Sequence, residues 1–568
     1  MHEDQKSTNQ PVFPLWLIFL PFILGLLVRF SGLGHPFLDN VEANVAMGVR
    51  EMVMESGGIV TQPLYSQITG VLFWLFEDTN FLARFLPALA GSLLVLFPWF
   101  FGNNITNRQK LIFSVGLALD PALMAASKTG SSLILAVFAM AVLLLAFSKK
   151  QPVLLGVSFA ALLLTGNYFL TGLIILAVTL LWMLKKSDRS EELKQEVLRS
   201  GWKKALLSFA ISYVLMASFG FLQPSGIGAG FQDIARLLGN SDPYRVPIGV
   251  GAIIFALVIY ELFPLVVSIL SITVYRREIT ALPAFCLRWL VVGLVVILLN
   301  ANRTALDLAW ISIPLWMVAS FGIEKIVSGI EKIQPLAVAA AGFYLLLLGF
   351  VLFTWVGAVN IEFDPQRLLI RVGLIVGGLL LVMISYWLTR FSWDIKTANQ
   401  GLLIGLGSVL LLFGLLTQSW HSANWGDQPQ NELWRMGSYP VDADRLLGSI
   451  EDISEMNRGR RQGQEVLMFA LDLPAVEWHL RQQKVSNVIN LSGASAPDMI
   501  LSDMVEPEFW RAEYAGQDFL LGATPDWSLL TWREWQQWII FRNLPVYSQQ
   551  WGILWVRTDL FPSATVSQ

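Results

Sequence analysis

Long apolar runs recur along the first three quarters of the chain and are separated by short polar segments. A helix of about 17 to 25 apolar residues crosses the hydrocarbon core of a bilayer, and roughly thirteen runs are of about this length. The pattern therefore predicts an all-α polytopic membrane bundle. The runs lie near residues 12–30, 84–102, 111–127, 133–147, 152–166, 168–184, 205–222, 247–275, 281–299, 306–323, 335–356, 368–388 and 401–418.

The chain changes character near residue 424, where charged residues become frequent and apolar runs shorten to strand length. Runs near residues 466–473, 485–491, 499–502 and 553–560 predict buried strands, and residues 476–483 and 532–542 have helical spacing. We therefore expect two domains. A transmembrane domain covers residues 1–423, and a C-terminal soluble α/β domain covers residues 424–568.

Lysine and arginine residues in the short loops predict the orientation, because positively charged loops stay preferentially in the cytoplasm. With the N-terminus in the cytoplasm, even-numbered connections carry Arg108, Lys110, Lys149, Lys150, a cluster from 185 to 204, Arg276, Arg277, Arg390 and Lys396. The first run lacks a small-residue cleavage site and predicts an uncleaved anchor. We therefore expect a plasma (cytoplasmic) membrane protein whose first loop, residues 31–83, and C-terminal domain are extracytoplasmic.

Composition supports the membrane class and narrows the chemistry. The chain is 55% hydrophobic and 14% charged, whereas soluble domains carry about 25% charged residues. Its 39 basic and 42 acidic side chains give a net charge of −3, which argues against a nucleic-acid partner. A single cysteine, Cys286, excludes a disulfide framework within the chain, and four scattered histidines do not suggest a metal site.

The first outer loop holds an acidic pair at the start of a predicted helix. Asp39 and Glu42 have the spacing of a capping box, and the helix is expected to continue to Ser56. A period of about 100° per residue places Glu42 at the edge of the apolar face. Its carboxylate is then directed toward the bundle or the membrane surface. A capping role and a functional role both remain open, and the two are compatible.

These features resemble the GT-C superfamily of membrane glycosyltransferases, which includes protein O-mannosyltransferases and aminoarabinose transferases. The residues that carry the resemblance are Glu42, the segments 50–53 and 56–60, and the Arg-x-x-Pro pattern of Arg84 and Pro87 at the start of the second span. Segments of the tail, residues 478–481 and 554–557, are similar to large prokaryotic transferases. The resemblance extends loosely over the whole chain.

The resemblance implies a membrane glycosyltransferase that moves a sugar from a polyprenyl phosphate to an extracytoplasmic protein, glycan or lipid acceptor. It implies that Glu42 or Asp39 acts as the catalytic base. Cations stabilise the departing phosphate in such a reaction. The expected substrate-binding residues are Arg84, Lys128, Arg303, His35 and Arg50. Arg303 could instead pair with Asp307 at a helix end, as a structural contact.

The chain departs from the family pattern in its acids. Val41 occupies the place of the first acid unless Asp39 replaces it, and residues 127–132, where a second acid is expected, hold no carboxylate. Lys128 in that segment could still bind phosphate. Hard cations require several oxygen ligands, so a divalent metal is poorly supported and we expect catalysis, if present, without one. No cofactor is predicted.

Two other functions compete with glycosyl transfer. The missing acids suggest a catalytically silent scaffold or lipid-binding subunit, whose C-terminal domain docks a membrane protein partner. A transporter or flippase is the third hypothesis. It is disfavoured because the spans show no paired interrupted helices in two halves and Glu261 stands nearly alone as an acid within them.

Overall fold

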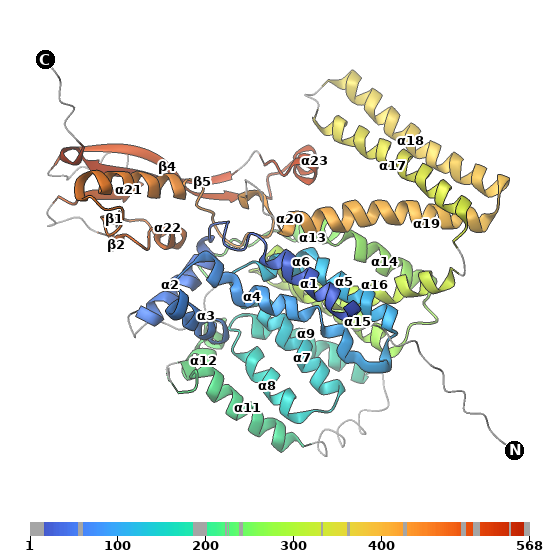
Figure 1. The fold of residues 1–568 in the computed structure, drawn as a ribbon, viewed down its shortest axis with the longest axis horizontal. Helices are drawn as coiled ribbons and strands as arrows, with labels where there is room; N and C mark the ends of the chain where they lie inside the picture. Colours follow the sequence, from blue (N-terminus) through green and yellow to red (C-terminus); the bar gives the residue numbers. More distant parts are fainter. Residues whose placement is uncertain are drawn as a thin grey trace.

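The protein is a helical bundle with a small mixed α/β unit at one end (Figure 1). The computed structural model describes residues 16–54, 61–185, 201–221, 224, 226–237, 242–330, 333–360, 364–423, 429–489, 496–503, 512–544 and 547–561. Some sequence predictions fall on residues outside this set, such as the end of the predicted helix at Ser56 and most of the cluster 185–204.

Every predicted span coincides with a helix or with a helix that breaks and continues. The first half of the bundle contains α1 (Trp16–Phe30), α2 (Asn40–Met54), α3 (Pro63–Phe76), α4 (Asn80–Leu94), η1 (Phe97–Asn104), α5 (Asn107–Leu119), α6 (Pro121–Ser127), α7 (Leu133–Ser148), α8 (Pro152–Leu163), α9 (Tyr168–Lys185), α11 (Trp202–Ala217) and α12 (Gly226–Leu237). Helix α2 is the one predicted in the first loop, and α3 is a second helix in that loop that was not predicted.

The second half continues with longer helices. It contains α13 (Val250–Tyr260), α14 (Leu262–Val274), α15 (Ala281–Leu299), η2 (Ala305–Leu308), α16 (Ala309–Gly329), α17 (Pro335–Asn360), α18 (Pro365–Ser392), α19 (Ile395–Leu411), η3 (Leu412–Leu416) and α20 (Thr417–Ala423). Two of the predicted spans are bent. The α5–α6 pair turns by 53° and the α13–α14 pair by 83°.

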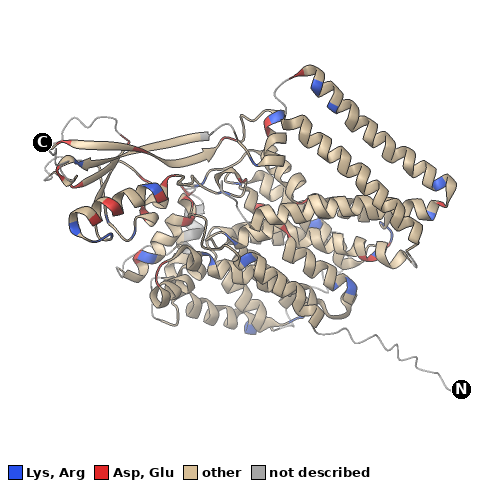
Figure 2. Cartoon of the chain, turned by 45° about the horizontal axis from the view of Figure 1, so that its top comes forward, with Lys and Arg blue, Asp and Glu red and all other residues tan. Residues whose placement is uncertain are grey.

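Length and hydropathy identify the chain as a multi-pass membrane protein. Within the described residues, six helices are long and apolar enough to cross a membrane, or eight when each bent pair counts as one span, and four shorter apolar helices accompany them. Figure 2 shows charged residues mainly at helix ends and in the C-terminal unit, with long uncharged stretches between. This distribution is the one a bilayer imposes, because a charge at its centre is costly.

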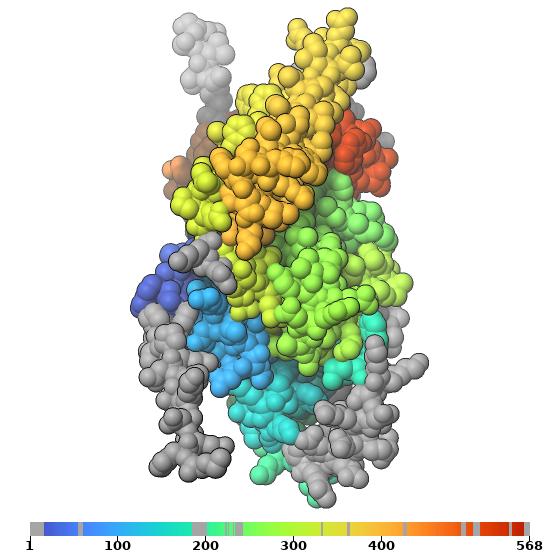
Figure 3. Space-filling view, turned by 90° about the vertical axis from the view of Figure 1, so that its right-hand side faces the viewer, coloured from blue at the N-terminus to red at the C-terminus, as the bar shows by residue number. Residues whose placement is uncertain are grey.

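The α17–α18 hairpin projects from the bundle. Figure 3 shows it in yellow, rising beyond the other helices. In α18, only 6% of the most apolar 18-residue window is buried, whereas the corresponding value for α16 is 94%. Apolar surface of this extent is stable next to lipid and unfavourable in water, so the hairpin fits a membrane-facing position.

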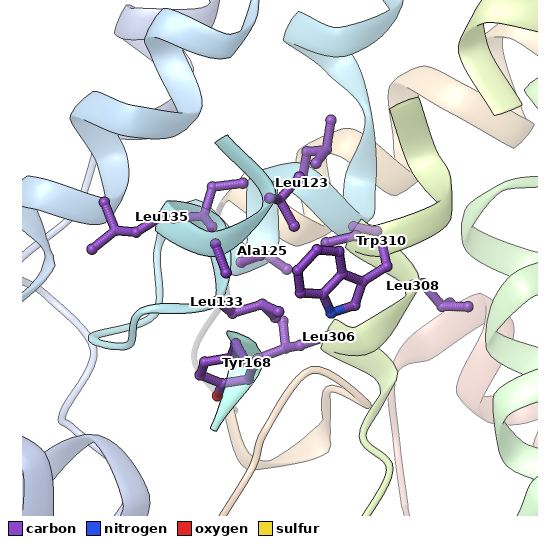
Figure 4. Close-up of a cluster of buried hydrophobic side chains, with 14 of the residues drawn as sticks. Leu123, Ala125, Leu133, Leu135, Tyr168, Leu306, Leu308 and Trp310 are labelled. Atoms are coloured by element: carbon purple, nitrogen blue, oxygen red, sulfur yellow. The ribbon is translucent and has the colours of Figure 1, made fainter. Parts of the chain in front are cut away.

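The bundle core surrounds α6 and α16. Figure 4 shows Leu123 and Ala125 of α6 gathered with Leu133 of α7 and Trp310 of α16; all four are buried in one continuous cluster. That cluster also includes Trp434, Trp478 and Trp538 from beyond residue 428. The C-terminal part of the chain therefore packs into the same core as the bundle.

The C-terminal unit is a five-stranded sheet with helices on one face. Its elements are η4 (Pro429–Asn431), α21 (Ala443–Arg458), β1 (Glu465–Phe469), α22 (Pro474–His479), β2 (Lys484–Val488), β3 (Met499–Ser502), β4 (Tyr514–Pro525), α23 (Trp532–Phe541), β5 (Tyr547–Arg557) and η5 (Thr558–Leu560). The strand order is β2-β1-β3-β5-β4. Strand β1 is parallel to β2 and β3, and β5 is antiparallel to β3 and β4.

The α/β prediction is confirmed, with corrections to its elements. Helix α21 and strand β4 were not expected, and the predicted strand 553–560 is the second half of the longer β5, which ends at Arg557. The predicted helix 476–483 is shorter and earlier, at Pro474–His479. The first four residues of β4 after Tyr514 are exposed, so the alternation that identifies a half-buried strand is missing there.

Candidate functional site

The acidic pair of the first loop is buried at the start of α2. Asp39 is the N-cap, because its Oδ1 accepts hydrogen bonds from the backbone N–H of Val41 (3.0 Å) and Glu42 (2.9 Å). The backbone N–H of Asp39 donates in return to Oε2 of Glu42, at 3.4 Å. The predicted capping box is therefore present. The apolar face of α2 consists of Val41, Val45, Val49 and Met52, and all four are buried.

Glu42 forms a two-point ion pair with Arg84 of α4. The Nε of Arg84 lies 2.9 Å from Oε1 and its Nη2 lies 2.7 Å from Oε2, and both side chains are about 1% exposed. The other Arg84 hydrogen bonds go to the carbonyls of Leu33, Pro36 and Phe37. Paired, parallel N–H···O bonds of this kind fix orientation as well as charge. Arg84 therefore holds the loop that leads into Asp39.

A segment from the far end of the chain closes over this pair. Residues 435–439, here called the strap, run beside residues 37–41. Both backbone N–H groups of Met436 and Gly437 donate to Oδ2 of Asp39, at 3.2 and 3.4 Å. The Nη1 of Arg435 lies 3.5 Å from Oε2 of Glu42.

Further contacts hold the strap in place. The backbone N–H of Asn40 donates to the Ser438 carbonyl, and that of Phe37 donates to the Tyr439 hydroxyl. The guanidinium of Arg435 lies over the Tyr439 ring, 4.7 Å from its centroid. Gly437 is required by close approach: an added Cβ would lie 3.1 Å from the Tyr244 carbonyl and from Val41.

The pKa values of the two carboxyl groups are shifted in opposite directions. Burial, and then the nearby charge of Glu42, raises the pKa of Asp39 above its usual value despite its hydrogen bonds. Burial alone would also raise the pKa of Glu42, but the charge and hydrogen bonds of Arg84, together with Arg435 and the Gly130 N–H, lower it. Glu42 is therefore ionised at neutral pH.

The segment that lacks the second acid lies directly against Glu42. The backbone N–H of Gly130 donates to Oε1 of Glu42 at 2.7 Å. Lys128, which is buried, donates to the carbonyls of Ser31 (2.6 Å) and Ala423. Burial, and then the positive charges of Arg84 and Arg29, lowers the pKa of Lys128 to about 8. A backbone donor thus contacts Glu42 where a carboxylate was expected, and the Lys128 ammonium lies close enough to Arg84 for the two positive charges to interact.

Three of the predicted binding residues have other contacts. The Nε of Arg50 pairs with Asp78 at 2.7 Å, and its Nη2 donates to the Arg481 carbonyl. Arg303 donates to the carbonyls of Ile248, Leu298 and Asn300 at the end of α15. The side chain of His35 is exposed. None of the described contacts of these three joins them to Glu42.

The alternative pairing of Arg303 with Asp307 is not what the structure shows. Asp307 Oδ2 accepts a hydrogen bond from the Thr304 N–H, as part of a capping box at η2. Arg303 instead satisfies carbonyls left open at a helix C-terminus, which is a common structural role for arginine.

Arg435 was not predicted from the sequence. It lies 393 residues after Glu42, in a stretch outside regular helices and strands between Trp434 and Met436. The available signal was a charged residue in an otherwise mostly apolar stretch that proved to be buried, since a buried charge usually has a partner. Nothing in the local pattern identified the partner as Glu42.

The carboxylate oxygens of Asp39 and Glu42 accept hydrogen bonds from N–H groups. Among the described residues, the hydrogen bonds to the Asp39 and Glu42 carboxylates come from backbone and guanidinium donors. Among the described residues, no group of three or more His, Cys, Asp or Glu side chains is placed to hold a metal ion. What the arrangement offers is an anion held between two buried guanidinium groups, with Lys128 nearby. Such cations bind phosphate well.

No family model matches the chain, and no curated protein matches it by sequence. Its fold is similar to two crystal structures of ArnT from Cupriavidus metallidurans. For the structure bound to undecaprenyl phosphate, the TM-score is 0.53 and the identity 14%, over 84% of this chain and 87% of that chain. For the apo state, the TM-score is 0.53 and the identity 13%, over 86% of this chain and 93% of that chain.

ArnT is an aminoarabinose transferase with the GT-C glycosyltransferase fold. The resemblance to the GT-C superfamily is therefore confirmed for the fold, which covers most of the chain. At 13–14% identity the likeness is one of architecture. The membrane bundle with an appended α/β unit is the architecture that the apolar pattern predicted.

Proposed function

We propose that the chain is a membrane glycosyltransferase that moves a sugar from a polyprenyl-phosphate donor to an extracytoplasmic protein, glycan or lipid acceptor. The observation that carries the proposal is the buried ion pair of Glu42 with Arg84 and Arg435, in a chain with an ArnT-like fold. Two guanidinium groups contact this one carboxylate, and Lys128 lies near Arg84, so positive charge is concentrated here. A phosphate leaving group requires such a concentration of positive charge.

The proposed reaction begins with an exchange of partners. The donor phosphate takes over hydrogen bonds from Arg84 and Arg435, with Lys128 as a third cation, and this frees an oxygen of Glu42. The freed carboxylate accepts the proton of the acceptor hydroxyl as that oxygen attacks the anomeric carbon. The bond between this carbon and the phosphate oxygen breaks, and polyprenyl phosphate departs with the bonding electrons. Asp39 holds Glu42 in place through the helix cap, and is the alternative base.

The predicted localisation, orientation and remaining binding residues belong to the same proposal. We propose that the protein lies in the cytoplasmic membrane, with its N-terminus in the cytoplasm and the unit after residue 424 outside. In this orientation, the cluster at Asp39 and Glu42 faces the outer surface, where a lipid-linked sugar is presented. His35, Arg50 and Arg303 contribute to substrate binding only indirectly, since their described contacts are with other partners.

The test is transfer of a labelled sugar from a polyprenyl-phosphate donor by the purified full chain, in wild type and Glu42→Gln. Glu51→Gln is the matched control, because Glu51 lies on the exposed face of the same helix. We expect Glu42→Gln to lose at least about 100-fold in rate, the usual range for a general base, while Glu51→Gln keeps its activity. Lipid binding without turnover in wild type would instead support the silent scaffold. Turnover unchanged in Glu42→Gln would refute the assigned base.

A further inference from the structure

Two broken helices meet in the core of the bundle, each with an acidic residue at its break. Asp120 stands between α5 and α6, and Glu261 stands between α13 and α14. Both side chains are 0% exposed. The sequence suggested that Glu261 is nearly alone among the spans, but the structure places the Asp120 carboxyl group against it. Neither residue belongs to the cluster at Glu42.

The two carboxyl groups differ in the donors that surround them. Asp120 accepts from the Leu123 N–H at 2.7 Å and from the indole N–H of Trp316 at 2.9 Å. Glu261 accepts one long bond, from the Ala122 N–H at 3.3 Å, through Oε1. Its Oε2 is buried and has no hydrogen-bond donor among the described residues. The environment therefore stabilises a negative charge on Asp120 and offers little to a second one on Glu261.

The charges nearby balance only one of the two acids. Arg29 of α1 is fully buried and donates to the carbonyls of Leu117 (2.9 Å) and Ala118 (3.1 Å), close to Asp120. Tyr260, the neighbour of Glu261, directs its hydroxyl to Glu432 and away from the pair. One buried cation against two buried carboxyl groups leaves an excess negative charge, and an uncompensated charge in such a place is very costly.

We propose that Asp120 and Glu261 bind a single proton between them, with Glu261 as the neutral acid that donates to the Asp120 carboxylate. The proton makes Oε2 of Glu261 a donor to Asp120, which gives this buried atom a hydrogen bond and removes the excess charge. Two carboxyl groups in contact cannot both ionise without strong repulsion. The pair then joins the α5–α6 break to the α13–α14 break by a hydrogen bond.

A proton fits this place better than a metal cation does. Sodium, calcium and magnesium ions require several oxygen ligands, whereas the groups directed at this pair are the N–H donors of Ala122, Leu123 and Trp316 and the single hydroxyl of Ser312. An N–H group turned toward a site repels a cation. The inference does not depend on glycosyl transfer, because it concerns groups that the proposed reaction does not use.

The test is infrared spectroscopy of the purified full chain at neutral pH, with Glu261→Gln. Glutamine has the shape of a neutral glutamic acid and keeps a donor toward Asp120. We expect Glu261→Gln to fold with an unchanged melting temperature and to lose one carbonyl band of a protonated carboxylic acid. The matched control is Glu278→Gln, which removes a half-exposed carboxylate paired with Lys325 and changes no such band.

Other results would overturn the proposal. Retention of every protonated-acid band in Glu261→Gln would show that Glu261 is ionised, and failure of this variant to fold would show that a neutral donor does not satisfy the site. Asp120→Asn leaves Arg29 without its counter-charge, so its melting temperature should fall below that of Glu261→Gln. Equal stability would contradict the assignment of the charge to Asp120. A wild-type melting temperature that rises in sodium relative to choline, but not in Glu261→Gln, would replace the proton with a sodium ion.

Discussion

Glu42 and Arg84 illustrate how a single contact can combine fold and chemistry. The pair is buried and hydrogen-bonded at both carboxylate oxygens. Removing one partner of a buried ion pair typically costs about 3–5 kcal/mol, because the other charge is left without compensation. Loss of activity in a Glu42 variant must therefore be separated from loss of structure.

The pH dependence of stability provides that separation. Because the pKa of Glu42 is lowered from 4.5, the stability contributed by its ion pair is complete above pH 4.5 and is lost as the pH falls below that value. We expect the stability difference between wild type and Glu42→Gln to be large at neutral pH and to shrink on acidification. Thermal melts of both proteins between pH 7 and about pH 3 measure it. A difference that stays constant with pH would contradict the ion pair.

Lys128 should set an alkaline limit on donor binding. Its pKa is lowered to about 8, chiefly by burial, so the charge that binds phosphate is present below this pH and is lost above it. The same shift means that folding is easier when Lys128 is neutral, and stability should rise from pH 8 toward 10.5.

We expect the KM for the lipid donor to increase above about pH 8 in wild type. In Lys128→Arg, which stays charged, this increase should be displaced to higher pH. Initial rates at several donor concentrations across pH 7 to about 10 provide the measurement. If the two profiles coincide, Lys128 does not bind the phosphate.

At the scale of elements, close helix packing predicts which small residues are required. An added Cβ at Gly116 of α5 would lie 2.1 Å from the Trp316 ring, whereas one at Gly373 of α18 would meet nothing within 4 Å. Overpacking of a filled core typically costs about 1–3 kcal/mol. Gly116→Ala should therefore lower the melting temperature, while Gly373→Ala, which improves helix propensity, should not. Equal effects of the two variants would contradict the packing described for α5 and α16.

Element prediction from the sequence succeeded where periodicity is strong. The apolar spans and the buried face of α2 follow from composition and from the period of about 3.6 residues. Helix α21 was missed because most of its residues are polar, and only Leu446, Ile450 and Ile453 enter the core of the sheet. Strand β4 was missed because its first half lies at an edge of the sheet and is exposed.

The site was only partly predictable for a different reason. Asp39 and Glu42 lie three residues apart, Arg84 belongs to a separate Arg-x-x-Pro pattern, and in the structure Glu42 contacts both. Arg435 and the Asp120–Glu261 pair depend on contacts over 393 and about 140 residues, and a local pattern contains no information on such contacts. The predictions for Arg50 and Arg303 assumed that a cation outside the membrane binds substrate. In the structure, Arg50 pairs with Asp78 and Arg303 donates to the Leu298 carbonyl.

At the scale of the whole molecule, the C-terminal unit is bound to the first loop by more than the strap. Arg481 donates through Nε and Nη2 to the Asp78 carbonyl, at 3.0 and 2.9 Å, and lies over the Trp478 ring. The indole N–H of Trp478 donates to Asn80, and the Ala475 N–H donates to Asn40. The unit and the loop therefore form one packed body at one end of the bundle.

Loosening this attachment should affect the site from a distance. We expect Arg481→Ala to accelerate amide hydrogen exchange at residues 78–80 and in the strap, and to raise the donor KM. Arg461→Ala, which removes an exposed ion pair with Glu455 in the same unit, is the control and should change neither. Mass-spectrometric exchange on the full chain gives the first result. Normal exchange in both variants would show that the unit does not support the loop.

The position of the strap in the sequence also determines when during biosynthesis the cluster at Asp39 and Glu42 can be completed. Ribosomes add residues from the N-terminus, so Glu42 and Arg84 enter the bilayer and its surface early. Arg435 and the amides that bind Asp39 follow only after every membrane helix up to α20 has been made. A nascent or prematurely terminated polypeptide thus inserts with an incomplete set of contacts at Asp39 and Glu42. These contacts form only once the last segment of the chain has been made and has folded.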